Sequence, residues 1–202
     1  MSSTSTTPDT PQQRNAAGKL IAIHNVIFGF LERMLASWLI PSLARLLVAA
    51  VLLGYFWSSA LTKLGDGFFG WLFPSSGAYV QMFPKAMEAV SYDQTALGFH
   101  YYLIALFGTW TEFILPLLIV VGLFTRLASI GLIGFIVVMS LTDVLGHAAD
   151  AATLGNWFDK SSGSLIADQR SLWIFMLIVL VLRGGGPFSL DRFLIEKPSK
   201  QS

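Results

Sequence analysis

The sequence contains no cysteine and few charged residues, and each of these absences excludes certain classes of protein. None of its 202 residues is a cysteine, which excludes disulfide bonds, CxxC redox chemistry, cysteine-ligated iron–sulfur clusters and covalently attached c-type haem. Only 12% of the residues are charged, about half the usual share in soluble domains, whereas 54% are hydrophobic. The formal net charge of +1 offers no basis for nucleic-acid binding. The composition therefore indicates an integral membrane protein.

Four long apolar windows predict four transmembrane helices. They lie approximately at residues 43–62, 101–124, 127–145 and 165–182. Each approaches the roughly 20 residues that a helix needs to cross about 30 Å of hydrocarbon. Because the backbone polar groups of a lone span must be satisfied within it, these windows are helices. We expect an all-α membrane protein built as a four-transmembrane-helix bundle, with its membrane domain at residues 41–194.

The segment before the first span has the pattern of a helix that lies on the membrane surface. Within residues 19–40, polar and small residues such as Asn25 and Glu32 share one face, and Ile27 and Phe30 lie on the other. We interpret this segment as an amphipathic interfacial helix ended by Pro41. A fifth span is the alternative, which the charged residues oppose. Residues 1–18 and 195–202 are expected to be cytoplasmic tails, the first disordered and without a cleavable signal peptide.

The distribution of lysine and arginine predicts the orientation of the bundle. With both termini in the cytoplasm, nine of the 13 lysines and arginines lie inside and four outside, as the positive-inside rule requires. Residues 63–100 then form a long outer loop rich in glycine, proline and aromatic residues. So apolar a loop is expected to fold over the bundle or dip into the membrane interface. Residues 146–164 form a second outer connection.

A carboxylate near the middle of the second span is the most unusual feature of the sequence. A carboxylate at the depth of Glu112 costs at least a few kcal/mol, and such groups are usually paired, protonated or functional. Small residues and a proline share its helix face and allow a neighbouring helix to approach: Ala105, Gly108, Thr109 and Pro116. Glu112 is therefore expected to face protein, either as a proton-handling group or as a structural hydrogen-bonding group between helices.

The remaining polar residues of the outer half are expected to form one layer. Asp143 and His147 lie four residues apart on one helix face, and Asp168 and Arg170 begin the fourth span. Lys63 follows the first span, in the same layer. Their alternative roles are an interfacial anchor for Lys63, a snorkelling helix end for Asp168 and Arg170, and a simple hydrogen bond between His147 and Asp143.

The helical rise places Glu112 about 18 Å below that outer layer. Because a lysine side chain reaches only about 6 Å, Lys63 is predicted not to pair directly with Glu112. Trp57, Ser58 or Ser59 are the expected neighbours of the carboxylate. His100 and His147, both at the outer end, form no spacing signature for haem or another metal, so we predict neither.

Three segments resemble the DoxX family of small four-helix membrane proteins. The stretch RLLVAAVLLGYFWSSALTKLGD resembles the first span, with Arg45 at its start and Lys63 after its end. The stretch TEFILPLLIVVGLFTRLAS is similar to the second span and its turn, with Glu112 and Arg126 in the family's places. The stretch RGGGPFSLDRFL resembles the ending after the last helix. The resemblance covers roughly residues 43–194, and it implies a four-helix bundle in a prokaryotic cytoplasmic (inner) membrane, with members associated with quinone-linked oxidoreductases.

The first functional hypothesis is a quinone-linked redox membrane protein, or the membrane subunit of an oxidoreductase. Lys63, His147 or Arg170 would donate hydrogen bonds to the quinone carbonyls, and Glu112 would accept or pass a proton. The other site candidates are Trp57 and Tyr55, which would line an apolar slot, and Asp143 and Asp168 in the outer layer. Electrons would come from a redox-enzyme partner or from the substrate. The alternatives are a non-enzymatic anchor of a redox complex and a proton-coupled small-molecule carrier. The expected partners are the lipid bilayer, a redox-enzyme subunit and further copies of the same chain.

Overall fold

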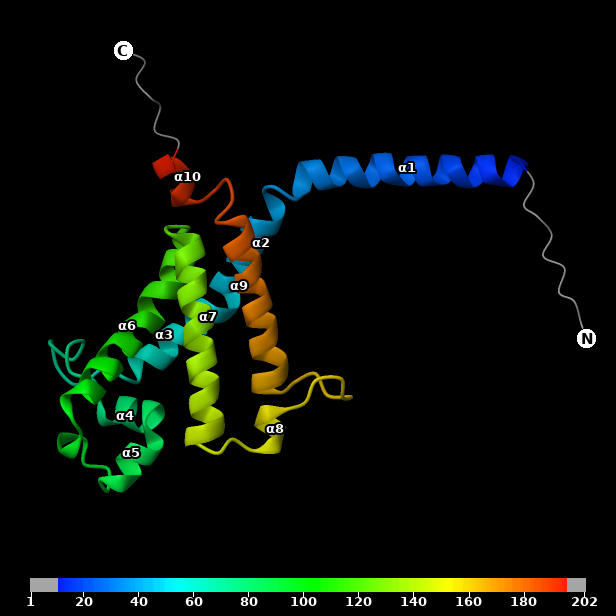
Figure 1. Cartoon of the computed structure of the whole chain (residues 1–202). Coiled ribbons are helices and arrows are strands. Elements are labelled where there is room, and N and C mark those ends of the chain that lie inside the picture. The colour runs from blue at the N-terminus through cyan, green and yellow to red at the C-terminus, as the bar shows by residue number, and fades with distance from the viewer. Residues whose placement is uncertain (1–10, 196–202) are drawn as a thin grey trace, which may run out of the picture.

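The structure, a computed structural model that describes residues 11–195, consists of helices and their connections (Figure 1). No strand forms within that range; Leu64 and Pro74 make an isolated antiparallel bridge. Four helices are long and apolar enough to cross a membrane: Leu39–Leu61, Phe99–Val121, Thr125–Gly146 and Leu165–Arg183. The prediction of an all-α, four-span membrane protein is therefore confirmed.

Three of the four spans combine α-helix with a π-helical segment. The first consists of α2 (Leu39–Leu47), η1 (Val48–Leu53) and α3 (Gly54–Leu61). The second is the single helix α6 (Phe99–Val121). The third joins α7 (Thr125–Leu141) to η3 (Thr142–Gly146), and the fourth joins η4 (Leu165–Arg170) to α9 (Ser171–Arg183). Two of these π segments lie beside the candidate site described below, where π turns are frequent.

The core of the bundle is apolar and draws on all four spans. Its fully buried side chains include Val48, Leu52, Phe56, Ile119, Leu132, Ile136, Leu177 and Leu180. Other apolar side chains of the spans, such as Leu46, Leu127 and Leu182, are exposed. In a span these exposed faces contact lipid, so the chain is a multi-pass membrane protein.

Helix α1 (Pro11–Leu35) extends away from the bundle (Figure 1). It begins at Pro11, eight residues before the predicted start at Lys19. Residues 1–10 and 196–202, where most of the two predicted tails fall, lie outside the described part of the chain. Helix α1 also ends at Leu35, before Pro41, which instead lies buried in the first turn of α2, where proline is tolerated. Its position on a membrane surface stays a prediction.

The outer loop folds over one side of α6, as predicted. It contains α4 (Ser76–Met82), α5 (Pro84–Ala89) and a 3₁₀ turn, η2 (Gln94–Ala96). Tyr79 and Met87 are buried with Ala105 of α6 in a second apolar cluster. Tyr102 Oη of α6 donates a hydrogen bond to the carbonyl of Leu72 at 2.9 Å. The second connection carries a short helix, α8 (Ala151–Leu154).

Helix α1 and α10 (Leu190–Ile195) lie at the same end of the bundle as the turn between α6 and α7 (Figure 1). An even number of spans requires this. Arg45 secures that end, because its guanidinium donates to the carbonyls of Ile119, Val120, Gly185 and Phe188. The last carbonyls of a helix lack donors from a following turn, and at the end of α6 the N–H of Gly122 and the guanidinium of Arg45 supply donors instead.

Candidate functional site

A cavity of about 930 Å³ lies between α3, α6, α7 and the outer loop. Six of the predicted site residues line it: Tyr55, Lys63, Glu112, Asp143, His147 and Arg170. Most of the remaining wall is apolar and includes Ile104, Phe107, Phe135 and Val138. Cavities of this size with mostly apolar walls and a few converging polar groups are typical of small-molecule sites.

Glu112 forms a buried ion pair with Lys63. Lys63 Nζ lies 2.9 Å from Glu112 Oε2, and both side chains are less than 5% exposed. The same ammonium group donates to Ser59 Oγ at 2.6 Å. The prediction that Lys63 would not reach Glu112 is therefore wrong, whereas Ser59 is a neighbour of the pair, as expected. The prediction that Glu112 faces protein is confirmed, because Ala105, Thr109 and Pro116 on the same helix face are also buried.

The ion pair forms because the first two spans are staggered along the bundle. Arg45 contacts the last turn of α6, and Trp57 Nε1 donates to the carbonyl of Phe113 at 3.1 Å. The first span therefore ends opposite the middle of α6. The outer part of α6 packs against the outer loop instead, through bonds such as Trp110 Nε1 to the carbonyl of Trp71. Lys63 therefore lies at the depth of Glu112 rather than at the start of α6, so the predicted separation of about 18 Å does not apply to this pair.

A second ion pair, between a buried arginine and a partly exposed aspartate, joins the third and fourth spans. Arg170 Nη2 lies 2.5 Å from Asp143 Oδ2, and Arg170 Nη1 donates to Ser140 Oγ at 2.9 Å. Arg170 is only 3% exposed, so the alternative that it marks a snorkelling helix end is wrong. Its Nε is buried and has no hydrogen-bond partner among the described residues. A buried donor without an acceptor is costly, and its presence in a cavity wall points to a ligand acceptor.

His147 and Tyr55 complete the predicted part of the cavity wall. His147 Nε2 donates to the carbonyl of Gln81 at 3.0 Å, so its partner is the outer loop rather than Asp143. The Tyr55 ring packs against Trp173, with ring centroids 5.1 Å apart. Both side chains are exposed and lie where α3 and the outer loop approach the cavity.

Two predicted site residues lie outside the cavity lining. The indole N–H of Trp57 donates its hydrogen bond to α6, and the residue is 36% exposed. The Asp168 carboxylate accepts hydrogen bonds from the backbone N–H and the hydroxyl of Ser164, both at 2.8 Å. Ser164 is the N-cap of the fourth span and its hydroxyl accepts from the N–H of Asp168, so Asp168 completes a reciprocal cap with it. Neither residue is in a position to contact a molecule in this cavity.

Further residues line the cavity that the sequence did not indicate as site residues. They include Gln81, Thr111, Gly131, Gly134 and Met139. Ser140, which holds Arg170, lies one turn before Asp143, so helical spacing contained a signal for it. Gly131 and Gly134 are likewise one turn apart in α7. The approach of the outer loop to α7 has no comparable signal, because it depends on the folding of the loop.

The site combines two cations with two anions, so its charges are balanced in pairs. Lysine and arginine supply hydrogen-bond donors, and the two carboxylates are able to hold or release protons. On the neighbouring α4, burial and the nearby Tyr102 raise the pKa of the Tyr79 phenol further above neutral pH. No group of three or more histidine, aspartate or glutamate side chains with metal-binding geometry occurs within residues 11–195.

The comparisons with known proteins support the family resemblance. The DoxX family model matches residues 40–147, which include the first three spans, Lys63, Glu112 and Asp143. The matched region ends before the fourth span, which carries Arg170. No curated protein and no solved structure matches the chain.

Proposed function

The chain belongs to the DoxX family, and from this premise we propose that its cavity binds the head group of a quinone, as the membrane component of a quinone-linked redox system. A quinone ring is apolar on its faces and carries two carbonyl acceptors. Its site therefore needs apolar walls, hydrogen-bond donors at the ring's edge and groups that handle protons. The cavity has each of these features.

The observation that carries the proposal is the unpartnered Nε of Arg170. This donor is buried in a residue of the cavity wall, and its two neighbouring nitrogens are held by Asp143 and Ser140. A carbonyl oxygen in the cavity would satisfy it. The walls contributed by Phe107, Phe135 and other apolar residues suit the ring and the first part of an isoprenoid tail.

The residues of the chain would bind and orient the head group and supply protons. When bound, a quinone supplies a carrier for two electrons and two protons. Arg170 would donate to one carbonyl oxygen, and Lys63, oriented by Ser59, would donate towards the other. Glu112 and Asp143, each paired with one of these cations, would hold the exchanged protons. Glu112 thus retains the proton-handling role predicted for it, now as a partner of Lys63.

The electrons would come from a redox-enzyme partner or from an oxidisable substrate. The sequence has no cysteine, and we identified no flavin motif in it. We place the protein in a prokaryotic cytoplasmic membrane with both termini inside, on the basis of the arginine and lysine distribution and of the family. Association with a redox enzyme, or as a homo-oligomer, is part of the proposal.

The proposal predicts that a side chain placed in the cavity displaces quinone. Gly134 lines the cavity and has open space where a Cβ would lie, so Gly134→Leu fills the cavity without a backbone clash. Gly54→Leu is the matched control, because Gly54 also has open space but lines no cavity described here. Quinone extracted from each protein after purification in mild detergent is quantified by mass spectrometry. We expect retention in wild type and Gly54→Leu, and at least a tenfold loss in Gly134→Leu.

Equal quinone retention in all three proteins would show that quinone binds elsewhere, as bulk lipid. A wild-type protein without quinone and without saturable binding of a short-chain quinone would contradict the proposal. In that case, a stable protein partner recovered with no bound small molecule would support the alternative of a non-enzymatic anchor.

A further inference from the structure

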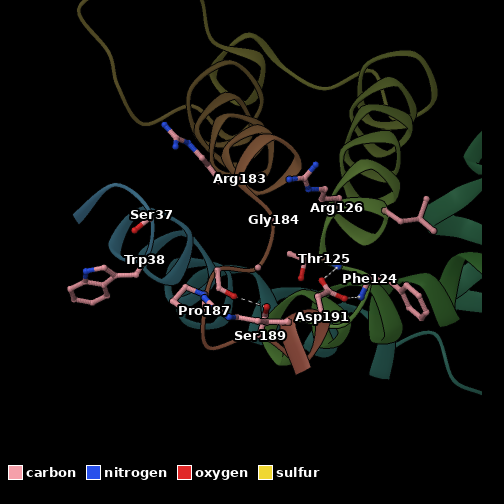
Figure 2. Close-up of a pocket in the computed structure, with 14 residues that line it drawn as sticks. Ser37, Trp38, Phe124, Thr125, Arg126, Arg183, Gly184, Pro187, Ser189 and Asp191 are labelled. Atoms are coloured by element: carbon pink, nitrogen blue, oxygen red, sulfur yellow. Dashed lines mark hydrogen bonds between the residues drawn. The ribbon is translucent and has the colours of Figure 1, made fainter. Parts of the chain in front are cut away.

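A second cavity, of about 690 Å³, lies beside α10 and the turn between α6 and α7, at the end of the bundle opposite α4 and α5 (Figure 1). Figure 2 shows the residues that line it. The start of α7, the end of α9, the connection to α10 and the residues before α2 contribute its lining. Three arginines and one aspartate are its ionisable lining residues: Arg126, Arg183, Arg192 and Asp191. The cavity therefore has an excess of positive charge.

The single carboxylate in this cavity has a structural role. Asp191 Oδ1 accepts a hydrogen bond from the backbone N–H of Phe124 at 2.6 Å, and Oδ2 accepts one from Thr125 at 2.9 Å. These bonds cap the start of α7 and attach α10 to it. Arg126 and Arg183, by contrast, make no hydrogen bond or ion pair with any described residue. Both guanidinium groups are therefore available to an anion.

A buried hydroxyl adds a further donor. Thr125 is fully buried, lines the cavity, and its Oγ1 has no hydrogen-bond partner in the described chain. The backbone beside it is open enough for a ligand because residues 184–186 are glycines. A Cβ on Gly185 would lie 2.6 Å from Thr125 Oγ1, and one on Gly184 would lie 3.4 Å from Arg126 Nε. The glycines thus keep the space next to both donors free.

The cavity lies at the level of a lipid head group. Three spans begin or end around it, at Leu39, Thr125 and Arg183. Trp38 and Phe124 line it and are 40% and 61% exposed, and aromatic side chains are enriched at the membrane–water interface. A ligand at this depth is able to place a charged group among the arginines and leave acyl chains in the bilayer.

We propose that this cavity binds the phosphate of an anionic phospholipid head group, with Arg126 and Arg183 as its charged contacts and Thr125 Oγ1 as a hydrogen-bond donor. Guanidinium groups bind phosphate oxygens through charge-assisted and often paired hydrogen bonds. The site is separate from the quinone cavity and does not depend on the function proposed for it.

The test measures lipid binding to the full-length protein in mild detergent. Dioctanoyl phosphatidylglycerol, dioctanoyl phosphatidylcholine and inorganic phosphate are titrated separately by calorimetry, and lipid adducts are counted by native mass spectrometry. We expect one high-affinity site for phosphatidylglycerol, at least about tenfold stronger than for phosphatidylcholine or inorganic phosphate. Inorganic phosphate binding as tightly as phosphatidylglycerol would show a site for free phosphate and overturn the lipid assignment, as would equal binding of phosphatidylcholine.

Two variants locate the site. Arg126→Gln/Arg183→Gln is expected to weaken phosphatidylglycerol binding at least about tenfold. The control Lys19→Gln/Arg33→Gln removes the same charge from α1 and is expected to bind as wild type. Thr125→Val removes only the unpartnered hydroxyl, so it is expected to keep the melting temperature and weaken binding severalfold. Equal weakening in the α1 control, or unchanged affinity in both cavity variants, would overturn the proposal.

Discussion

The Lys63–Glu112 pair places two opposite charges in a buried position beside the cavity. Removing one member leaves the other buried without its counter-charge, which typically costs about 3–5 kcal/mol. We therefore expect Glu112→Gln and Lys63→Met each to lower the free energy of unfolding by about 3 kcal/mol. The double variant Lys63→Met/Glu112→Gln is expected to recover much of this loss, because no unpaired charge remains. Unfolding of the four proteins in detergent, arranged as a double-mutant cycle, measures the coupling.

The same cycle separates stability from function. The double variant lacks both the proposed proton carrier Glu112 and the proposed quinone donor Lys63, so it is expected to unfold nearly as wild type but to lose quinone-linked turnover. Additive effects of the two single substitutions on stability would contradict the ion pair. A double variant with full turnover would leave Glu112 as a packing and pairing residue.

The turn between α6 and α7 is the tightest connection between spans. Gly122 ends α6 in the left-handed region, with φ of 78°. A Cβ there would lie 2.6 Å from Ser189 Cβ and 2.9 Å from Arg45 Cζ, so it would collide with both segments that hold this end together. The family resemblance in this turn therefore has a steric basis: only glycine fits.

We predict that Gly122→Ala lowers the free energy of unfolding by about 2 kcal/mol or more, since both the backbone conformation and the space are unfavourable. Gly134→Ala is the control. Its Cβ meets open space in the middle of α7, so it is expected to be neutral or to stabilise by up to about 1 kcal/mol. Thermal unfolding in detergent compares the two. A Gly122→Ala protein as stable as wild type would show that the turn is able to rearrange.

The four-span bundle does not cover the apolar side chains of helix α1. Its apolar side chains, such as Ile27 and Phe30, are at least half exposed, and a membrane surface would cover them. Because the chain lacks cysteine, a single cysteine introduced at Leu31 can carry an environment-sensitive fluorophore. We expect blue-shifted emission in vesicles, and loss of that shift in Ile27→Asp/Phe30→Asp.

The matched control places the same charges on the polar face, as Ala22→Asp/Asn25→Asp, and is expected to keep the blue shift. A shift that survives both pairs of substitutions would mean that protein rather than lipid covers α1. Evidence that this segment crosses the membrane would add a fifth span and contradict the interfacial interpretation.

At the scale of the whole molecule, the orientation in the membrane is open to a direct test. Single cysteines at Ser76, in α4, and at Ser162, after α8, are predicted to react with impermeant thiol reagents in intact cells. A cysteine at Ser199, which lies outside the described residues, is predicted to react only after permeabilisation. Labelling of Ser199 in intact cells would reverse the predicted orientation and place the end of the bundle that holds the second cavity outside the cell.

The spans and the protein-facing side of Glu112 followed from the sequence for a simple physical reason. A bilayer requires each span to be a continuous apolar helix, so hydropathy alone reports where the spans lie. Small residues one turn apart similarly indicate which face meets another helix. These are properties of one segment at a time, and the structure agrees with them at residues such as Ala105 and Thr109.

Only the tertiary structure decided which residues of different segments meet. The stagger between the first span and α6, which brings Lys63 to Glu112, depends on packing along the whole contact and leaves no mark in either segment's hydropathy. The partner of Arg170 and the capping role of Asp168 also depend on tertiary packing and on local geometry that periodicity does not show. The sequence by itself determined a four-span membrane bundle with ionisable groups inside it. The fold determined how those groups pair and where the two cavities lie, because pairing is set by the relative positions of helices and loops.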